Sequence, residues 1–514
     1  MSEAPVGQKP PESPSSTLTF LKGRWIDGWN PEDVDQWENQ GGEKIAKRNL
    51  IFSIFVEHLG FVTWGLWAIV AVQLQVAKDG TPGPFGFAFT SSQVFWLISL
   101  PSLIGATLRF PYTFMVAKLG GRNWTIVSGT LLLIPTTCLA LAIGNHPVNG
   151  VGGTSFGVMA LVASLAGFGG GNFASSMANI TFFYPQRRKG WALGMNAAGG
   201  NIGQAVIQFF VPIIISVFAF TALNGLTPNA KTHKIINLPA AGYFWIPFIL
   251  AAVVCAFLFM NNLTSAKSDS TGYVAALKEP HNWILSFLYI GTFGSFIGLS
   301  GAFPKLINDN FHTYSTIQLG AVGVGLSFLG PLVGSLIRPF GGWLADRLGG
   351  AYVTTAAFVV MIASTLASIM VIRANITHEL TKFVLFLICF MVLFAATGTG
   401  NGSMYKMIPT VYNELAGQVD AQHKSAGIAV ERKISASLGI VSAIGAYGGF
   451  LIPQVFNKAV TLKEHTLGVP TGNAAAITPG YTMGLWWLFG AYIVFLLVHI
   501  AIYIVPYARR GVKV

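Results

Sequence analysis

The chain has 514 residues, of which 53% are hydrophobic and only 10% are charged. Soluble proteins carry about 25% charged residues, so this composition excludes an ordinary soluble domain and indicates a membrane protein. The formal net charge is +12, but the basic residues are dispersed between apolar segments, and no nucleic-acid partner is expected.

The N-terminal tail, residues 1–47, is polar and lacks the features of a cleavable signal peptide. Its stretch 23–50 is rich in tryptophan and predicts a short interfacial helix, with Asn30 as the cap and Pro31 at the first helical position. The tryptophans are then expected at the level of the lipid headgroups.

Twelve apolar segments follow, each long enough to cross a bilayer as a helix of ~20 residues. They cover residues 48–74, 92–117, 124–144, 156–184, 190–220, 242–262, 283–304, 319–345, 352–372, 381–412, 433–457 and 481–506. The sequence therefore predicts an all-α membrane protein with twelve spans.

The distribution of Lys and Arg predicts the orientation. Most of those outside the spans fall on one side when both termini are placed in the cytoplasm, as expected for a cytoplasmic (inner) membrane protein. The predicted organisation is a six-helix bundle over 48–262, a cytoplasmic linker over 263–282, a second bundle over 283–506 and a cytoplasmic tail over 507–514.

A repeat relates the two halves by a shift of 229 residues. It superimposes the helix of Arg109 on that of Arg338, and it superimposes GFGGGNF at 167–173 on ATGTGNG at 396–402. Further pairs matched by the shift are Gly105 with Gly334, Gly169 with Gly398, Gly171 with Gly400 and Asn172 with Asn401. One shift that fits two separate helices indicates a duplicated six-helix unit, with the copies parallel in the membrane.

Arg109 and Arg338 are intramembrane charges, and no carboxylate lies in either apolar segment beside them. The repeat places them opposite each other near the midplane, where two like charges repel strongly. A small anion from outside would join them, and the planar guanidinium fork suits a planar oxyanion. Charge alone allows nitrate, nitrite, chloride, formate or a small phosphate.

Other side chains are candidates for the same site or for helix packing. Amides and hydroxyls recur at helical spacing in two segments, and Asn201 is favoured because glycines flank it; packing between helices is the alternative. Tyr289 and Phe293, four residues apart, and Phe173 could clamp a planar ligand. The amides and hydroxyls of the first segment are Asn172, Ser176 and Asn179, and the amides of the second are Asn201, Gln204 and Gln208.

The motifs GNFASSMANITFF, GMNAAGGNIGQAVIQ, YIGTFGSFIG, ADRLGG and GTGNGS, in this order, resemble those of the nitrate/nitrite porter family of the major facilitator superfamily. The resemblance covers about residues 30–506. It implies two bundles that rock about a central site and an anion held by Arg109 and Arg338. It also implies contacts from Asn201, Tyr289, Phe293 and Phe173.

The resemblance also points to gating and packing positions. The superfamily's acidic loop residue is kept in the second copy, as Asp346 beside Arg347, but the first copy has Ala117. The loop gate of the first half is therefore in doubt. Residues expected to serve gating or packing are Gly169, Gly171, Asn172, Gly199, Gly200, Gly203, Gly398, Gly400, Asn401, Asp346 and Arg347.

Three titratable residues in the spans, Glu57, His58 and Lys406, bear on energy coupling. Intramembrane ionisable groups are by default functional hypotheses, which slightly favours proton/nitrate symport over nitrate/nitrite exchange. Glu57 is the favoured proton carrier, with Lys406 as its partner when deprotonated. A purely structural Glu57–Lys406 ion pair is the alternative.

The rival classes are less well supported by the sequence. No catalytic carboxylate pair or metal-ligand cluster is apparent, so neither an enzyme nor a cofactor is expected, and a sensor would need a larger soluble domain. A channel does not require the repeat, and a sugar or drug carrier does not explain the arginines. Cys138, Cys255 and Cys389 lie in apolar segments and are interpreted as small core residues. The expected partners are nitrate, nitrite, lipid and, for symport, H+; the oligomeric state is open, with a monomer as the expectation.

Overall fold

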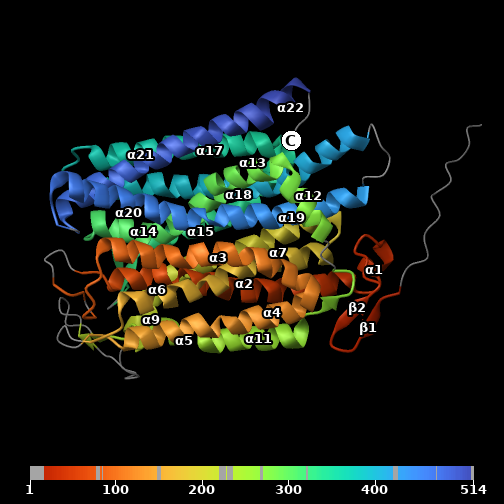
Figure 1. Ribbon diagram of the computed structural model, residues 1–514, viewed down its shortest axis with the longest axis horizontal. Helices are drawn as coiled ribbons and strands as arrows, with labels where there is room; N and C mark the ends of the chain where they lie inside the picture. The colour runs from red at the N-terminus through yellow and green to blue at the C-terminus, as the bar shows by residue number, and fades with distance from the viewer. Residues whose placement is uncertain are drawn as a thin grey trace, which may run out of the picture.

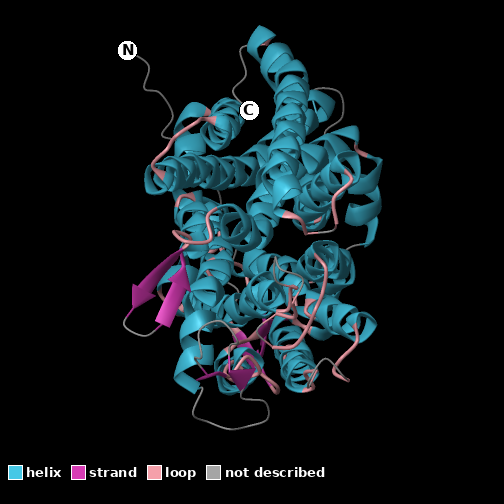
Figure 2. Cartoon of the chain, turned by 90° about the vertical axis from the view of Figure 1, so that its left-hand side faces the viewer, coloured by secondary structure: helices cyan, strands magenta, loops and turns pink. Residues whose placement is uncertain are grey.

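Long helices run side by side in two bundles, the N-terminal half of the chain below and the C-terminal half above in Figure 1. Seen from one end of the molecule, most of these helices point toward the viewer (Figure 2). The computed structural model describes residues 17–76, 81–83, 85–147, 152–218, 227–228, 235–266, 270–319, 322–420, 427–470 and 472–510.

Several spans consist of two helices joined by a single non-helical residue. The N-terminal half contains α2 (Gly42–Gln73), α3 (Ser91–Leu119), α4 (Gly121–Leu131), α5 (Leu133–Gly144), α6 (Phe156–Leu165), α7 (Gly167–Phe183), α8 (Gln186–Asn201), α9 (Gly203–Val217), α10 (Ala240–Tyr243) and α11 (Ile246–Phe259). A short hairpin between α9 and α10 is formed by β3 (Thr227–Pro228) and β4 (Ile235–Ile236).

The C-terminal half is built in the same manner. It contains α13 (Pro280–Tyr289), η2 (Ile290–Gly294), α14 (Ser295–Asn310), η3 (Leu326–Phe328), α15 (Leu329–Leu336), α16 (Arg338–Leu348), α17 (Gly350–Arg373), α18 (Glu379–Asp420), α19 (Gly427–Ala446), α20 (Gly448–Leu467), α21 (Ala474–His499), η4 (Ile500–Ile504) and α22 (Val505–Arg509).

Within the described ranges, eleven helical segments are long and apolar enough to cross a bilayer. The remaining expected span, 319–345, differs from the sequence prediction. Its first residues belong to a hairpin of β6 (Thr316–Leu319) and β7 (Val322–Gly325), and helix begins only at Leu326. Glycine is a poor helix former, and Gly323 and Gly325 favour the extended backbone here. The span is therefore α15 followed by α16.

The repeat is visible in how two equivalent helices end. Gly120 closes α3 with φ +87°, and Gly349 closes α16 with φ +97°. These positions are 229 residues apart, and both need a backbone conformation that only glycine adopts without strain. The two copies of the repeat therefore end the equivalent helix with a glycine in the same backbone conformation.

The N-terminal tail departs from the expected interfacial helix over 23–50. Residues 17–27 include a hairpin of β1 (Thr19–Leu21) and β2 (Trp25–Asp27), and β2 pairs in parallel with β5 (Asn262–Leu263) after α11. Among the described residues 17–41, only α1 (Val34–Glu38) is helical, and its cap is Asp33 instead of Asn30. Long-range strand pairing with β5 competes successfully with local helix propensity.

Two tryptophans of this tail, Trp29 and Trp37, are buried in protein, which corrects their expected place at the headgroups. Trp29 donates a hydrogen bond from Nε1 to the carbonyl oxygen of Phe182 (3.0 Å), and Trp37 packs edge-on against Tyr184. The tail therefore fastens onto the end of α7.

Asn261 joins the segment after α11 to α2, so its replacement by alanine is expected to lower stability. Its Oδ1 accepts hydrogen bonds from Arg48 (2.8 Å) and Asn49 (3.3 Å), and its backbone N–H donates to Asn49 Oδ1. Buried groups left unpaired cost about 1–3 kcal/mol each. Thermal unfolding of the purified protein should shift down by several degrees for Asn261→Ala. The exposed Asn39→Ala should shift it little; equal shifts would contradict the proposed role.

The linker contains α12 (Ser270–Lys278), which lies against α19. Tyr273 on this helix packs against Phe114 of α3, with ring centroids 4.3 Å apart, and burial raises the pKa of Tyr273 to about 12. The linker therefore contacts both halves at one end of the bundles, hereafter the linker end.

The three cysteines are free and partly buried. Cys138 packs against the core of the N-terminal half, in line with the interpretation as a small core residue.

Candidate functional site

Arg109 lies on α3, is fully buried, and points into the joint between the two halves. Its Nε donates to the carbonyl oxygen of Gly170 (3.1 Å) in its own half, and its Nη1 donates to the carbonyl oxygen of Ser442 (2.7 Å) on α19. The buried Nη2 has no hydrogen-bond partner among the described residues. One nitrogen of the fork is thus left for a further acceptor.

Glycines bring the helix of Arg109 close to α7. A Cβ at Gly105, one turn before the arginine, would lie 3.1 Å from the Cα of Gly170. Backbones that approach this closely allow Arg109 to reach a main-chain carbonyl on the neighbouring helix.

Arg338 begins α16, directly after the break at Ile337, and is 3% exposed. Its Nη2 lies 3.4 Å from the hydroxyl of Tyr289, which donates to Oδ1 of Asn401 (2.6 Å). Nη1 is buried without a partner in the described part of the chain. Like Arg109, it keeps one unused donor.

Aromatic rings lie beside both guanidinium groups. The ring centroid of Phe293 lies 5.0 Å from Cζ of Arg109 and 5.5 Å from Cζ of Arg338. Phe173 stacks on Phe293 from the other half (5.7 Å, 20°), and Tyr289 stacks on it from the same helix (5.2 Å, 18°). Cation–π contact partly compensates each buried charge.

The helix that supplies Tyr289 and Phe293 is irregular at this point. The π-helical turn η2 covers Ile290–Gly294, and such turns inside helices often mark functional sites. Gly294 in the same turn packs against Gly448 at backbone distance. This close contact packs the irregular turn against α20 within the C-terminal half, and Phe293 of the same turn stacks on Phe173 of the other half.

Neither arginine forms an ion pair with a carboxylate within the described residues, where the recorded ion pairs involve other basic side chains. Two desolvated cations without a counter-ion are costly, and the remaining donors point to an anion as their ligand. All rings and guanidinium groups named above are nearly inaccessible, so the site is closed to solvent in this conformation.

The structure brings Arg109, Arg338, Tyr289, Phe293 and Phe173 together, but other candidates lie apart. Asn201 is buried and donates to the carbonyl oxygen of Ala197 on its own helix (2.6 Å). No contact with either arginine is recorded for it, so its place in the site stays a prediction. Its Oδ1 has no partner in the described structure.

The polar faces of α7 and of α8–α9 mainly serve helix packing. Ser176 bonds to Ser53 (2.8 Å), Asn179 packs over Gly121, and Gln204 donates to the carbonyl oxygen of Phe61 (3.1 Å). Asn172 lies against Gly60. Gln208 reaches the other half, donating to the carbonyl oxygen of Ser300 (2.8 Å).

Glu57 occupies a polar pocket between α2, α7 and α8. It is 1% exposed, and its Oε2 accepts from Nδ2 of Asn196 (2.6 Å), which also lies 2.7 Å from Ser176 Oγ. Oε1 has no partner among the described residues and lies directly over Gly200, where any Cβ would collide with it. The neighbouring His58 contacts the carbonyl oxygen of Gly199 (3.0 Å).

Lys406 does not pair with Glu57, which corrects the expectation of a Glu57–Lys406 contact. Its Nζ lies 2.8 Å from Oδ1 of Asp346, and both side chains are about half exposed. Arg347, which follows Asp346, stacks over Trp343, with its Cζ 4.1 Å from the ring centroid. By the 229-residue shift, Asp346 and Lys406 correspond to Ala117 and Met177, so the first copy lacks both partners of this pair.

The predicted packing glycines lie at close helix contacts. An added Cβ would meet neighbouring backbone or side-chain atoms within 3 Å at each of them: Gly169, Gly171, Gly199, Gly200, Gly203, Gly398 and Gly400. Asn401, predicted to serve gating or packing, accepts a hydrogen bond from the hydroxyl of Tyr289 beside Arg338.

Sequence reasoning missed several contributors. The carbonyl oxygens of Gly170 and Ser442 leave no trace in side-chain patterns, and neither does the position of Asn196. Tyr405 could have been found from the sequence as a site residue, because it follows Asn401 by one helical turn. Its ring centroid lies 6.0 Å from Cζ of Arg338.

Two helical bundles that close around a buried, cation-lined site define a membrane transporter. Residues 50–453 match the Major Facilitator Superfamily. The nitrate/nitrite transporter NarU of Salmonella typhimurium is 38% identical over 86% of this chain and 91% of its own length. The probable nitrate/nitrite antiporter NarK2 of Thermus thermophilus is 33% identical over 84% and 89%.

Solved structures agree on the fold. A bacterial homologue of the lysosomal transporter Spinster matches with a TM-score of 0.58 and 16% identity, over 90% of this chain and 96% of that chain. A proton-dependent oligopeptide transporter matches with a TM-score of 0.60 and 12% identity, over 90% and 100%. The chain belongs to the Major Facilitator Superfamily and, within it, to the nitrate/nitrite transporters, as its motifs indicated; it is a transporter, not an enzyme.

Proposed function

We propose that this protein carries nitrate, and also nitrite, across the cytoplasmic membrane by alternating access of its two halves. The observation that carries the proposal is the pair of buried arginines, each with one guanidinium nitrogen left unpaired between the halves. An anion bound there would receive donors from Arg109 in one half and Arg338 in the other. The names of the relatives support the choice of nitrate and nitrite.

The guanidinium donors and the aromatic rings of the site favour a planar anion. Stacked rings of Phe173 and Phe293 stand beside both guanidinium groups, and a guanidinium fork donates in its own plane. Nitrate and nitrite are planar and singly charged, so they match these donors without crowding the rings. A tetrahedral dianion is bulkier and loses more hydration.

Purified protein in liposomes is expected to take up nitrate, and nitrite, in preference to chloride and sulfate. Labelled nitrate uptake would be measured with each unlabelled anion as competitor at equal concentration. Nitrite should inhibit strongly, chloride and sulfate weakly, because neither presents planar oxygens to the two forks. Chloride that competed as well as nitrite would refute a site selective for planar anions.

The orientation proposed here places both termini and the linker in the cytoplasm. The linker end carries Arg187, Arg188 and Lys406, in accord with the excess of basic residues on cytoplasmic loops. The opposite end of the bundles is then the outer side.

For coupling, proton/nitrate symport is proposed with Glu57 as the proton carrier. Glu57 is a fully desolvated carboxylate with one unpaired oxygen and no basic ion-pair partner in the described structure. A buried carboxyl group without a bonded cation is costly to ionise, and a change in the packing of α2 against α8 would alter that cost. With Lys406 bound to Asp346, the partner of Glu57 is Asn196.

Nitrate/nitrite exchange is the second candidate, and the arginines themselves favour it. An empty carrier leaves two unneutralised charges near each other, so its halves should resist reorientation until an anion returns. The name of the Thermus relative, an antiporter, points in the same direction.

A further inference from the structure

A buried ion pair on α14 plays no part in the proposed anion site. Nζ of Lys305 lies 2.8 Å from Oδ2 of Asp309, one turn later on the same helix, and the two side chains are 0% and 6% exposed. A buried ion pair is costly to desolvate, and replacing it by apolar groups is often neutral or stabilising. The ion pair is therefore expected to have a role other than stability.

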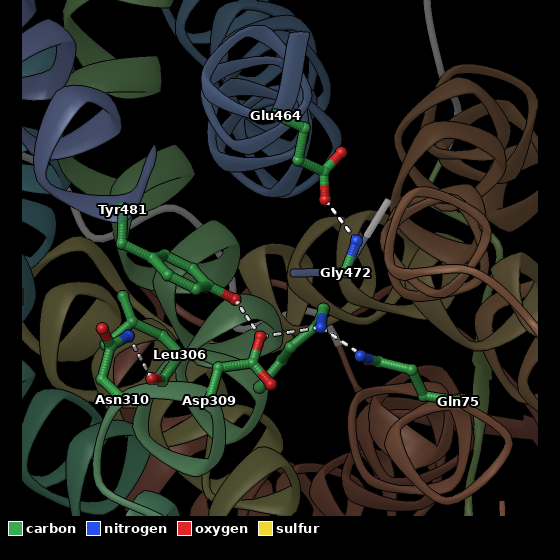
Figure 3. A network of polar contacts seen from close by, with 8 residues as sticks. Gln75, Leu306, Asp309, Asn310, Glu464, Gly472 and Tyr481 are labelled. Atoms are coloured by element: carbon green, nitrogen blue, oxygen red, sulfur yellow. Dashed lines mark hydrogen bonds and ion pairs between the residues drawn. The ribbon is translucent and has the colours of Figure 1, made fainter. Parts of the chain in front are cut away.

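The two members of the pair contact different halves of the protein; Figure 3 labels Asp309, its partner Tyr481, and Gln75 of the other half. Lys305 donates to Oε1 of Gln75 (2.6 Å), just beyond the end of α2, and lies 5.1 Å from the ring centroid of Phe95 on α3. Asp309 accepts from the hydroxyl of Tyr481 (2.9 Å) on α21 of its own half. Lys305 is thus shared between the halves, while Asp309 holds it from one side.

This junction lies at the end of the bundles remote from the linker. Figure 1 shows α14 toward the opposite end from α12, and Gln75, just after α2, meets Lys305 of α14 there. A second bond between the halves lies toward the same end, where Nε2 of Gln454 donates to Oγ of Ser99 (2.7 Å). Since the anion site is buried, this end is shut.

We propose that Lys305 is a latch that closes the end remote from the linker, by binding Gln75 across the halves. When the halves separate there, the bond to Gln75 and the contact with Phe95 break, but the ion pair with Asp309 travels intact with α14. The cation therefore never becomes unpaired, which makes the latch reversible. α14 continues the helix of Phe293, so the same span reaches from the anion site to the latch.

The best test removes the acceptor and leaves the ion pair. Gln75→Leu keeps the size of the side chain but offers Lys305 no bond across the halves. Hydrogen bonds to charged groups are strong enough that losing one should raise the ratio of open to closed molecules roughly tenfold. The matched control is Thr478→Val, which deletes a hydrogen bond to Asn310 (2.9 Å) inside the C-terminal half.

Opening would be followed by double electron–electron resonance between spin labels at this end. Suitable sites are Gly157, where an added Cβ meets nothing within 4 Å, and the exposed His465 in the last turn of α20. Both would be replaced by cysteine in a background from which the native cysteines have been removed: Cys138, Cys255 and Cys389.

The expected result is a larger long-distance population in Gln75→Leu and an unchanged distribution in Thr478→Val. An unchanged distribution in Gln75→Leu, or an equal change in both variants, would overturn the latch. The measurement needs no anion, so its failure is distinguishable from failure of the proposed nitrate transport.

Discussion

Replacement of Arg109 or Arg338 by lysine is expected to reduce nitrate uptake into liposomes by roughly tenfold to a hundredfold, although the positive charge is kept. Lysine has one ammonium nitrogen in place of three nitrogens spread over a planar fork, so that one atom could not reach the carbonyl oxygens of Gly170 and Ser442, to which Arg109 donates, and also an anion. Each lost charge-assisted hydrogen bond is worth about 1.5–3 kcal/mol.

The matched control is Arg373→Lys, an exposed arginine at the end of α17, which should leave uptake unchanged. All variants would be compared at equal reconstituted amounts, with thermal unfolding to check that they are folded. Near-normal uptake by folded Arg109→Lys or Arg338→Lys would remove that arginine from the site.

Glu57→Gln is expected to abolish nitrate accumulation driven by a proton gradient, inside alkaline, while nitrate/nitrite exchange continues. Glutamine has nearly the same shape and its Oε can still accept from Asn196, so packing over Gly200 is retained. It cannot take up or release a proton. The measurement compares the steady-state nitrate ratio with and without the gradient, beside an exchange assay at symmetrical pH.

Glu464→Gln provides the control for changing a buried carboxyl group to an amide. Glu464 is 5% exposed and accepts from the backbone N–H of Gly472, remote from Glu57, so gradient-driven accumulation should persist in this variant. Accumulation that survives Glu57→Gln would exclude Glu57 as the proton carrier. Fast exchange by the wild-type protein without any response to pH would establish an exchanger and reject symport.

The two experiments test different parts of one mechanism. The arginines belong to the joint between the halves, whereas Glu57 lies within the N-terminal half among α2, α7 and α8. Coupling would then operate through helix packing, because Gly199 and Gly200, on which His58 and Glu57 rest, belong to the same helix as Asn201. An effect of Glu57→Gln on anion affinity alone would contradict this division.

The sequence predicted the membrane class, the repeat and the two arginines, because each follows from composition or from position along the chain. A lone arginine in an apolar segment is conspicuous wherever the helix packs, and a constant shift of 229 residues needs no coordinates. Tyr289 and Phe293 were placed on one face by helical periodicity alone, and their stacking agrees with that expectation.

Only the tertiary structure decided which groups meet across long separations. Ser442 beside Arg109, Asn196 beside Glu57, Asp346 beside Lys406 and Gln75 beside Lys305 join different helices. The β2–β5 pairing likewise replaced a locally reasonable helix. A buried polar group without a partner is unfavourable, so it bonds to a group that the packing of the helices brings near. That packing depends on the whole fold and not on the local sequence.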